Sequence, residues 1–381
     1  MFESKLPSVG TTIFSVMTAL AQKAGAVNVS QGFPDYPIDP LLTDLLEQAS
    51  RDGWNQYAPM PGVSALRLRV SEKYEGIHGC RVDPELEVTI TPGGTAAIFS
   101  ALAAVIRPAD EVIVFEPCYD SYGPSVEMIG GVVVPLPLQT PSYTPDWDQV
   151  REAITPKTRV IIINTPHNPC GSTLTSSDIN ELAEICERHN ILVISDEVYE
   201  LITFDGVQHV SPLMHSSLRD RCFVISSFGK TFHITGWKVG VCVASELLTR
   251  EFRKAHQFIS FSVNAPAQHA LATYMSEPSN YARLSEFFVN KRNLFRELMS
   301  GSKWSIRPCT GSYFQLIGYE SISAEHDVDF AQRLVRENGV ACIPLSPFYR
   351  ESSATPDMVL RVCFAKSDET LREAARRLRS V

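Results

Sequence analysis

Short apolar runs rich in β-branched residues recur along this chain, and segments with a helical pattern separate many of them. The runs occupy residues 88–91, 112–115, 132–135, 160–164, 192–196, 223–226 and 239–244. Helical patterns fill residues 96–106, 146–153 and 176–189. Near-continuous apolar strands that alternate with helices are typical of a mostly parallel sheet covered on both faces. The sequence therefore predicts an α/β fold built on a large, mostly parallel sheet of seven strands.

One connection departs from this pattern. Parallel neighbours need a long crossover connection, usually a helix. The segment between the runs at 223–226 and 239–244 is too short to hold one. We therefore expect the last strand of the sheet to run antiparallel to its neighbour.

The length of 381 residues predicts one large domain and a smaller one. Pro278-Ser279-Asn280 interrupts the helical region that follows the last strand, and a long amphipathic segment comes next. We place the boundary there, so that residues 41–285 form the large domain and 286–381 a small α/β domain. Residues 1–40 are rich in Gly and Pro and too short to fold alone, and we expect them to join the small domain.

The composition limits the partners of the chain. A net charge of −9 without a long basic run argues against nucleic acid, because phosphate binding needs a basic surface. No apolar stretch reaches 18 residues, so no membrane span is predicted. The nine cysteines are scattered and lack metal-ligand spacing. This fits a protein of the reducing cytoplasm that has no metal site and no structural disulfide.

A lysine stands where one of the buried runs ends, in the segment Ser226-Ser227-Phe228-Gly229-Lys230. Burying an ammonium group costs several kcal/mol unless it is paired or neutralised. An amine that forms a Schiff base, however, needs a lowered pKa and a fixed position. Ser227 and the nearby Lys238 carry groups that a phosphate would bind. A single lysine in such a loop usually faces solvent, and only the other candidate segments favour a buried Lys230.

Other candidate residues also follow predicted strands. Gly94 and Thr95 open a helix after the first strand, and bare amides at a helix start bind phosphate. Tyr119 follows the second strand and could stack on a planar ring. Asn168 follows the fourth strand in a stiff, proline-rich turn, whereas we interpret the preceding His167 as structural. Each residue has an ordinary structural reading when it is taken alone.

The fifth strand ends in Asp196, and Tyr199 lies three residues beyond it. A carboxylate at the end of so apolar a strand needs a cationic or hydrogen-bonding partner. A protonated pyridine nitrogen would serve, although a helix N-cap is a competing interpretation. Ligands in open α/β sheets lie beyond the carboxyl ends of the strands, so we expect all these residues to meet.

Together these side chains match one cofactor, pyridoxal 5′-phosphate. Lys230 would hold its aldehyde carbon, and Asp196 would keep its ring nitrogen protonated so that the ring can take up electrons. The remaining predicted contacts are Asn168 and Tyr199 to the ring 3-oxygen, Tyr119 stacked on the ring, and Gly94, Thr95, Ser227 and Lys238 around the phosphate.

The chain resembles the fold-type I pyridoxal-phosphate aminotransferases of the class I and II group. The segments that carry the resemblance are NTPHNPCG at 164–171, SDEVY at 195–199, SSFGK at 226–230, TGWK at 235–238 and RVCF at 361–364. Three further segments resemble the branch that acts on methionine and aromatic amino acids, with the kynurenine and glutamine aminotransferases next. They are VSQGFPDY at 29–36, QYAPM at 56–60 and FSVNAPAQ at 261–268.

The resemblance implies further roles. Arg361 would clamp the substrate α-carboxylate, assisted by Asn168 and the Gly32 backbone. Without the family, Arg361 would be read as a surface arginine. Tyr57 would reach the cofactor phosphate of a neighbouring subunit, which implies a homodimer with shared active sites. Gly229 and Lys238 stand where the broad group usually has serine and arginine, and the nearer branch shares both departures.

We therefore expect an aminotransferase that moves the amino group of methionine, or of another apolar or aromatic L-amino acid, to a 2-oxo acid. The freed Lys230 amine would remove the Cα proton and return it to the cofactor. No arginine lies in the expected cross-subunit loop, residues 256–268. The residues expected around the substrate are aromatic instead: Phe14, Phe33, Tyr36, Tyr119, Tyr122, Phe258 and Phe261. Such a pocket favours apolar side chains over aspartate.

Four alternatives remain at this point. A kynurenine–oxoglutarate aminotransferase or a cysteine-S-conjugate β-lyase would keep the same catalytic residues. A decarboxylase is disfavoured, because Arg361 would hold the carboxylate near the ring plane, away from the labile position. The fold also occurs as the ligand-sensing module of transcription regulators. That arrangement needs an N-terminal DNA-binding domain, and about forty residues precede the expected catalytic domain.

Overall fold

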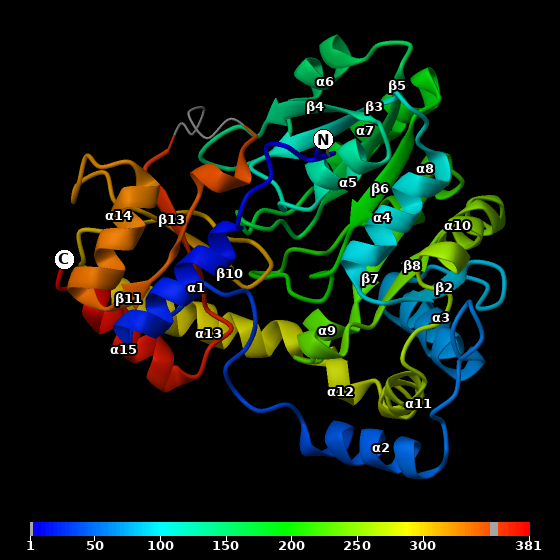
Figure 1. Cartoon of the computed structure of the whole chain (residues 1–381), viewed down its shortest axis with the longest axis horizontal. Helices are drawn as coiled ribbons and strands as arrows, with labels where there is room; N and C mark the ends of the chain where they lie inside the picture. Colours follow the sequence, from blue (N-terminus) through cyan, green and yellow to red (C-terminus); the bar gives the residue numbers. More distant parts are fainter. Residues whose placement is uncertain (1–2, 351–356) are drawn as a thin grey trace.

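The computed structural model describes residues 3–350 and 357–381 and contains a seven-stranded and a four-stranded sheet (Figure 1). Residues 1–2 and 351–356, which fall in the first and last predicted segments, lie outside the described residues. The large sheet has the strand order β2-β8-β7-β6-β5-β3-β4. Its strands are β2 (Val88–Thr91), β3 (Glu111–Glu116), β4 (Val132–Pro137), β5 (Thr158–Asn164), β6 (Leu192–Asp196), β7 (Cys222–Ser227) and β8 (Gly240–Val243).

Five strands of the large sheet, β4, β3, β5, β6 and β7, run parallel. β8 is antiparallel to both of its neighbours, β7 and β2. The predicted α/β class, the mostly parallel sheet and the antiparallel last strand are confirmed. The short chain between β7 and β8 holds only the one-turn helix α9 (Phe228–Thr231) and the 3-10 turn η2 (Thr235–Trp237), which cannot cross the sheet.

Helices cover both faces of this sheet, so alternate residues of each strand enter two different cores. In β7, for example, Phe223 and Ile225 enter one core while Val224 enters the other. The first core is completed by α4 (Gly94–Val105), α5 (Tyr122–Met128) and α10 (Glu246–Ile259). The second is completed by α3 (Ser64–His78), α6 (Trp147–Ala153), α7 (Ser176–His189), α8 (Ser216–Arg219), α11 (Ala265–Tyr274) and the turn η1 (Pro212–Met214). α2 (Pro40–Arg51) packs on α11.

The smaller sheet is antiparallel, with the strand order β12-β13-β10-β9. Its strands are β9 (Ser305–Ile306), β10 (Phe314–Gly318), β12 (Ile343–Pro344) and β13 (Val359–Cys363). The helices of this region are α12 (Ser279–Ala282), α13 (Leu284–Met299), α14 (Asp327–Arg333), the π-helical turn η3 (Leu334–Asn338), the 3-10 turn η4 (Ser346–Phe348) and α15 (Asp368–Leu378). α13 extends from the small sheet toward the large one (Figure 1).

An N-terminal helix and strand pack with the C-terminal part of the chain in this smaller region. α1 (Ile13–Ala24) leads into β1 (Val27–Asn28), which pairs in parallel with β11 (Val340–Ala341). α1 packs on β11, and α15 packs on β1 and β11 (Figure 1). The segment that follows β1 then runs toward the ends of β6 and β7. The domain boundaries at residues 40 and 285 stay predictions. None of the described helices is long and apolar enough to cross a membrane.

Candidate active site

One cavity opens where β5, β6 and β7 end. Its lining residues are Gly93, Gly94, Thr95, Ile98, Tyr119, Asn168, Asp196, Val198, Tyr199, Ser227, Gly229, Lys230, Thr235, Lys238 and Val239. Nine of the ten residues predicted to contact a cofactor are in this set, and Tyr57 is the exception. The structure therefore brings together residues from six segments of the chain, although their roles toward a cofactor stay predictions.

Lys230 lies on α9, directly after β7. Its amine donates a hydrogen bond to the carbonyl oxygen of Gly32 at 3.2 Å. Burial lowers the pKa of this amine to about 8, and the positive charges of Arg361 and Lys238 act in the same direction. A large neutral fraction is therefore present at mildly alkaline pH, as a nucleophilic or basic lysine requires.

Gly229 precedes Lys230 at a point where α9 passes close to η2. A Cβ atom at Gly229 would lie 3.1 Å from the Cα of Thr235 and 3.4 Å from the Ile234 carbonyl oxygen. Most of these neighbours are backbone atoms, which cannot give way as a flexible side chain would. The glycine thus lets the turn that carries Lys230 approach the turn that leads to Lys238.

Asp196 is buried at the end of β6. One carboxylate oxygen accepts a hydrogen bond from the Tyr122 hydroxyl at 2.7 Å, and the other accepts one from the Val198 amide at 3.3 Å. Burial nevertheless raises the pKa of Asp196 to about 6, against the effect of these hydrogen bonds. A carboxylate in this position would gain from a cation in the cavity, and a protonated pyridine nitrogen is such a cation.

The opposite end of the cavity is suited to an anion. Gly93 has φ +86°, and α4 begins at Gly94, so unpaired amides of the first helical turn lie at the cavity wall. Lys238, itself left-handed at φ +54°, places its ammonium so near that a Cβ at Gly93 would lie 3.0 Å from it. The Thr95 hydroxyl lies 3.2 Å from that of Tyr119. Amides, hydroxyls and an ammonium are the donors that a phosphate needs.

Arg361 lies on β13 of the small sheet and is 1% exposed. The interpretation of Arg361 as a surface arginine is therefore wrong. Its guanidinium donates to Asn168 Oδ1 at 2.7 Å and to the Ser30 carbonyl at 2.9 Å. Among the described residues its Nε has no hydrogen-bond partner. Burial lowers its pKa to about 10. A buried cation with an unused donor has the charge and the geometry that a carboxylate ligand needs.

Aromatic rings enclose this guanidinium. Its central carbon lies 4.0 Å from the ring centre of Phe314 and 5.2 Å from those of Phe14 and Phe348. The rings come from α1, β10 and the turn η4, which are far apart in the sequence. Of the aromatic residues expected around a substrate, Phe14 therefore lies beside Arg361, and Tyr119 lines the cavity.

The other expected aromatic residues lie elsewhere. Tyr122 is buried behind Asp196, and Tyr36 packs against His233 with ring centres 5.2 Å apart. Phe33, Phe258 and Phe261 are exposed. Tyr57 is 82% exposed and contacts the ring of Phe261 at 5.4 Å, outside the cavity. His167 is also outside it, and burial lowers its pKa to about 3, so this ring is neutral.

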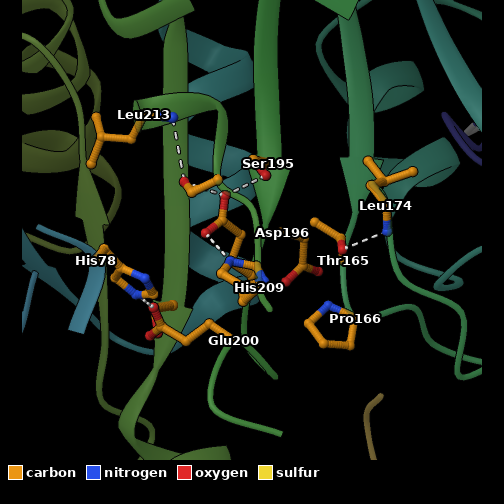
Figure 2. A network of polar contacts seen from close by, with 12 residues as sticks. His78, Thr165, Pro166, Leu174, Ser195, Asp196, Glu200, His209 and Leu213 are labelled. Atoms are coloured by element: carbon orange, nitrogen blue, oxygen red, sulfur yellow. Dashed lines mark hydrogen bonds and ion pairs between the residues drawn. The ribbon is translucent and has the colours of Figure 1, made fainter. Parts of the chain in front are cut away.

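The turn after β6 also carries two carboxylates that the sequence analysis missed. Glu197 and Glu200 are buried and do not line the cavity. They belong to a polar network that also holds Ser195, His209 and His78, and Figure 2 shows Glu200 beside His78. Glu197 accepts hydrogen bonds from Ser195 at 2.7 Å, Ser211 at 2.8 Å and His209 at 2.7 Å. Glu197 and Glu200 are three residues apart, as are Asp196 and Tyr199. This shared spacing was the sequence signal that could have identified the two glutamates.

Glu200 lies 2.5 Å from the ammonium of Lys73 on α3 and 3.3 Å from His78, and it accepts a hydrogen bond from Ser226. Burial alone would raise its pKa, but the Lys73 charge and the His78 contact outweigh that effect and lower it. Glu200 is therefore ionised and fully paired. The network fixes the turn from behind and leaves Asp196 and Tyr199 at the cavity.

Known proteins resemble this chain over its whole length. A profile of the family "Aminotransferase class I and II" matches residues 24–378. The methionine aminotransferase of Escherichia coli K12 is 45% identical, with 100% of this chain and 98% of the relative covered. The kynurenine–oxoglutarate transaminase of Dictyostelium discoideum is 32% identical, with 96% and 93% covered.

Two solved structures give the same result. YbdL from Escherichia coli, whose structure and reactivity identify a methionine aminotransferase function, aligns with a TM-score of 0.97 at 45% identity, over 100% of both chains. The N-succinyldiaminopimelate aminotransferase of Mycobacterium tuberculosis aligns with a TM-score of 0.95 at 35% identity, again over 100% of both chains.

Proposed function

This chain belongs to the class I and II aminotransferases, which are pyridoxal-phosphate enzymes, and we propose that it uses methionine or another apolar or aromatic L-amino acid as amino donor and a 2-oxo acid as acceptor. The observation that carries the proposal is Arg361, a buried guanidinium with an unused donor, enclosed by aromatic rings and bonded to Asn168 of the cavity wall. An amino acid whose carboxylate binds there would place its side chain among apolar groups.

The cavity residues fit pyridoxal phosphate as the cofactor. Gly94, Thr95, Ser227 and Lys238 would hold its phosphate, Tyr119 would stack on its ring, and Lys230 would attach to its aldehyde carbon. The raised pKa of Asp196, caused by burial, would fall when the carboxylate gains the ring nitrogen as a cationic partner. When bound, this cofactor supplies an electron sink that makes the Cα proton of an amino acid labile.

The chain's own residues would then divide the work. Arg361 and Asn168 orient the substrate by its carboxylate, and a guanidinium forms the two parallel hydrogen bonds that fix a carboxylate plane. Lys230, with a pKa lowered to about 8 by burial, would be the base that accepts the Cα proton. Such proton transfer contributes roughly 10²–10⁴-fold to rate. Tyr199 lies beside this lysine, with its ring centre 5.8 Å from the Lys230 amine.

The absorption spectrum of the purified enzyme tests this proposal. Addition of L-methionine alone should convert the visible band of the lysine-bound cofactor to the near-ultraviolet band of its amine form. Arg361→Lys should need far more methionine for the same conversion, because an ammonium lacks the fork. A band that ignores methionine but responds to kynurenine would move the donor class to that of the kynurenine transaminase relatives. Pyruvate and ammonia from a cysteine conjugate, without an oxo acid, would reveal β-lyase activity.

We further propose that the enzyme is a homodimer in which Tyr57 completes the partner's cavity. An aromatic surface supports this: Trp54, Tyr57, Phe258 and Phe261 are 50%, 82%, 85% and 48% exposed. Large rings are rarely left in water without a partner. Mixed dimers of Lys230→Ala and Tyr57→Ala chains test the arrangement. Each mixed dimer would hold one intact cavity, so activity should return when the chains are co-expressed and stay absent from each variant alone.

A further inference from the structure

A buried tyrosine that lies outside the predicted site touches the same oxygen atom as the Lys230 amine. Tyr313, just before β10, is 0% exposed, and its hydroxyl donates to the Gly32 carbonyl at 2.6 Å. The Lys230 amine donates to that oxygen at 3.2 Å. One carbonyl therefore links a residue of the small sheet to the lysine that follows β7.

The Gly32 carbonyl has little freedom to move. A Cβ at Gly32 would lie 2.9 Å from the ring of Phe314, so the backbone there is pressed against that ring. The flanking residues are also tied down, because Ser30 accepts a hydrogen bond from Arg361 and Phe33 accepts one from Lys366. The position of the carbonyl is thus set by the small sheet, and the Tyr313 hydroxyl is its shortest contact.

Tyr313 also contacts Tyr199. Their rings are edge to face with centres 4.9 Å apart, and the two hydroxyls interact. The Lys230 amine lies 5.7 Å from the centre of the Tyr313 ring and 5.8 Å from that of Tyr199. Burial raises the pKa of Tyr313 well above its ordinary value, so its hydroxyl remains a donor throughout the working range of an enzyme.

We propose that Tyr313 is a positioning residue for catalysis: its hydroxyl holds the Gly32 carbonyl as the acceptor to which Lys230 returns whenever its amine is not bonded to the cofactor. This inference depends on the proposed role of Lys230. The Tyr313 hydroxyl already donates a hydrogen bond to the Gly32 carbonyl oxygen. This bond limits how strongly the same oxygen can stabilise the ammonium form of Lys230.

The prediction concerns protonation, so the other groups that face the amine matter. They are Asp196, Tyr199, Lys238, Arg361 and Cys363. A substitution that removes only the Tyr313 hydroxyl leaves all five in place. The carbonyl would then accept from Lys230 alone, and the ammonium form would be favoured. One hydrogen bond has a net value of about 0.5–1.5 kcal/mol, which corresponds to a shift of about 0.4–1 pH unit.

The rate at which the cofactor-free full chain combines with pyridoxal phosphate, followed by visible absorbance across pH, measures this directly. Only the neutral amine attacks the aldehyde, so the rate should rise with a midpoint near 8 in the unaltered protein. Tyr313→Phe should move the midpoint upward by about 0.4–1 unit. 3-Fluorotyrosine at position 313, a stronger donor, should move it downward.

Tyr319→Phe is the matched control. Tyr319 is also buried in the small region and also donates to a backbone carbonyl, that of Glu325 at 2.9 Å, away from the cavity. It should leave the midpoint unchanged. An unshifted midpoint in Tyr313→Phe, an equal shift in Tyr319→Phe, or an upward shift with fluorotyrosine would overturn the inference. Failure of the unaltered protein to develop a visible band would instead overturn the proposed function.

Discussion

The turn Asp196–Glu200 has two sides that treat buried charge in opposite ways. On one side Glu197 and Glu200 lie in a network where each carboxylate has several donors, and the pKa of Glu200 is lowered by Lys73 despite its burial. On the other side burial raises the pKa of Asp196 to about 6 and lowers that of Lys230 to about 8. Three carboxyl groups of one turn therefore lie in two different electrostatic environments.

The difference shows what separates a structural charge from a functional one. Both sets of groups are removed from water, which penalises the charged form. The network compensates within the protein, so its charges add to stability. The ionisable groups of the cavity have too few partners of opposite charge within the protein. A ligand that carries the matching charges can therefore bind there favourably. Changes on the two sides should therefore have opposite signatures in stability and activity.

The largest effect is expected on the cavity side. Lys230→Ala should reduce transamination by at least 10²–10⁴-fold, because the proton-transfer group is gone. Stability should not fall, because the substitution removes a buried amine whose charged form is penalised. Steady-state assays and urea unfolding check both statements. The control is Lys291→Ala, because Lys291 lies on α13 and does not line the cavity. Near-normal turnover by Lys230→Ala would refute the proposed catalytic role.

A comparable change on the network side should act on stability. Glu200→Gln leaves the Lys73 ammonium buried without its counter-charge, which costs about 3–5 kcal/mol in other buried pairs. Urea unfolding measures the loss. Glu251→Gln breaks an exposed pair with Lys254 and should change stability by under about 1 kcal/mol. An equally small effect of Glu200→Gln would mean that the network does not hold the turn.

Asp196→Asn should stabilise the cofactor-free protein. A carboxyl whose pKa is raised in the folded state favours folding at low pH, and that contribution is lost as pH rises through the folded pKa of about 6. Above that pH the buried, ionised carboxylate lowers the free energy of unfolding, and the neutral amide does not. Asp196→Asn should therefore raise the free energy of unfolding by about 3 kcal/mol at pH 8 and by about half of that at pH 5. Urea unfolding at the two pH values tests it. Affinity for pyridoxal phosphate should fall in the same variant, whereas equal gains at both pH values would contradict the assignment.

The smallest effects come from two neighbours on β7 that face opposite sides. Ser226 donates to Glu200 in the network, whereas Ser227 lines the cavity. Ser226→Ala should cost about 1 kcal/mol of stability and leave cofactor affinity unchanged. Ser227→Ala should lower cofactor affinity and leave the stability of the cofactor-free protein unchanged. Each variant is the control for the other, and a similar profile in both would remove the distinction between the two sides.

Much of the fold could be predicted, because it depends on local patterns. Each strand of the large sheet is an apolar run that can be seen in the sequence. The short connection before β8 was enough to predict that β8 runs antiparallel to β7. The cavity could be predicted for a related reason. Parallel strands bring their carboxyl ends to one edge, so residues after different strands had to meet there.

The rest depends on contacts between distant segments. Arg361 looks like a surface residue in its own segment, and only the rings of Phe14, Phe314 and Phe348 make its position a buried one. Glu197 and Glu200 resemble solvated charges until α3 supplies Lys73. Tyr57 could not be placed at a site from one chain, since its proposed partner is a second copy.

The pairing of β1 with β11 joins residues that are more than 300 positions apart, and Arg361 donates to Ser30 across a similar span. Contacts of such long sequence separation form late in folding. During synthesis the large sheet has all its strands once the ribosome has passed β8, but Arg361, the proposed carboxylate-binding residue, has not yet been made. The proposed carboxylate-binding site therefore cannot form until the chain has been translated past Arg361.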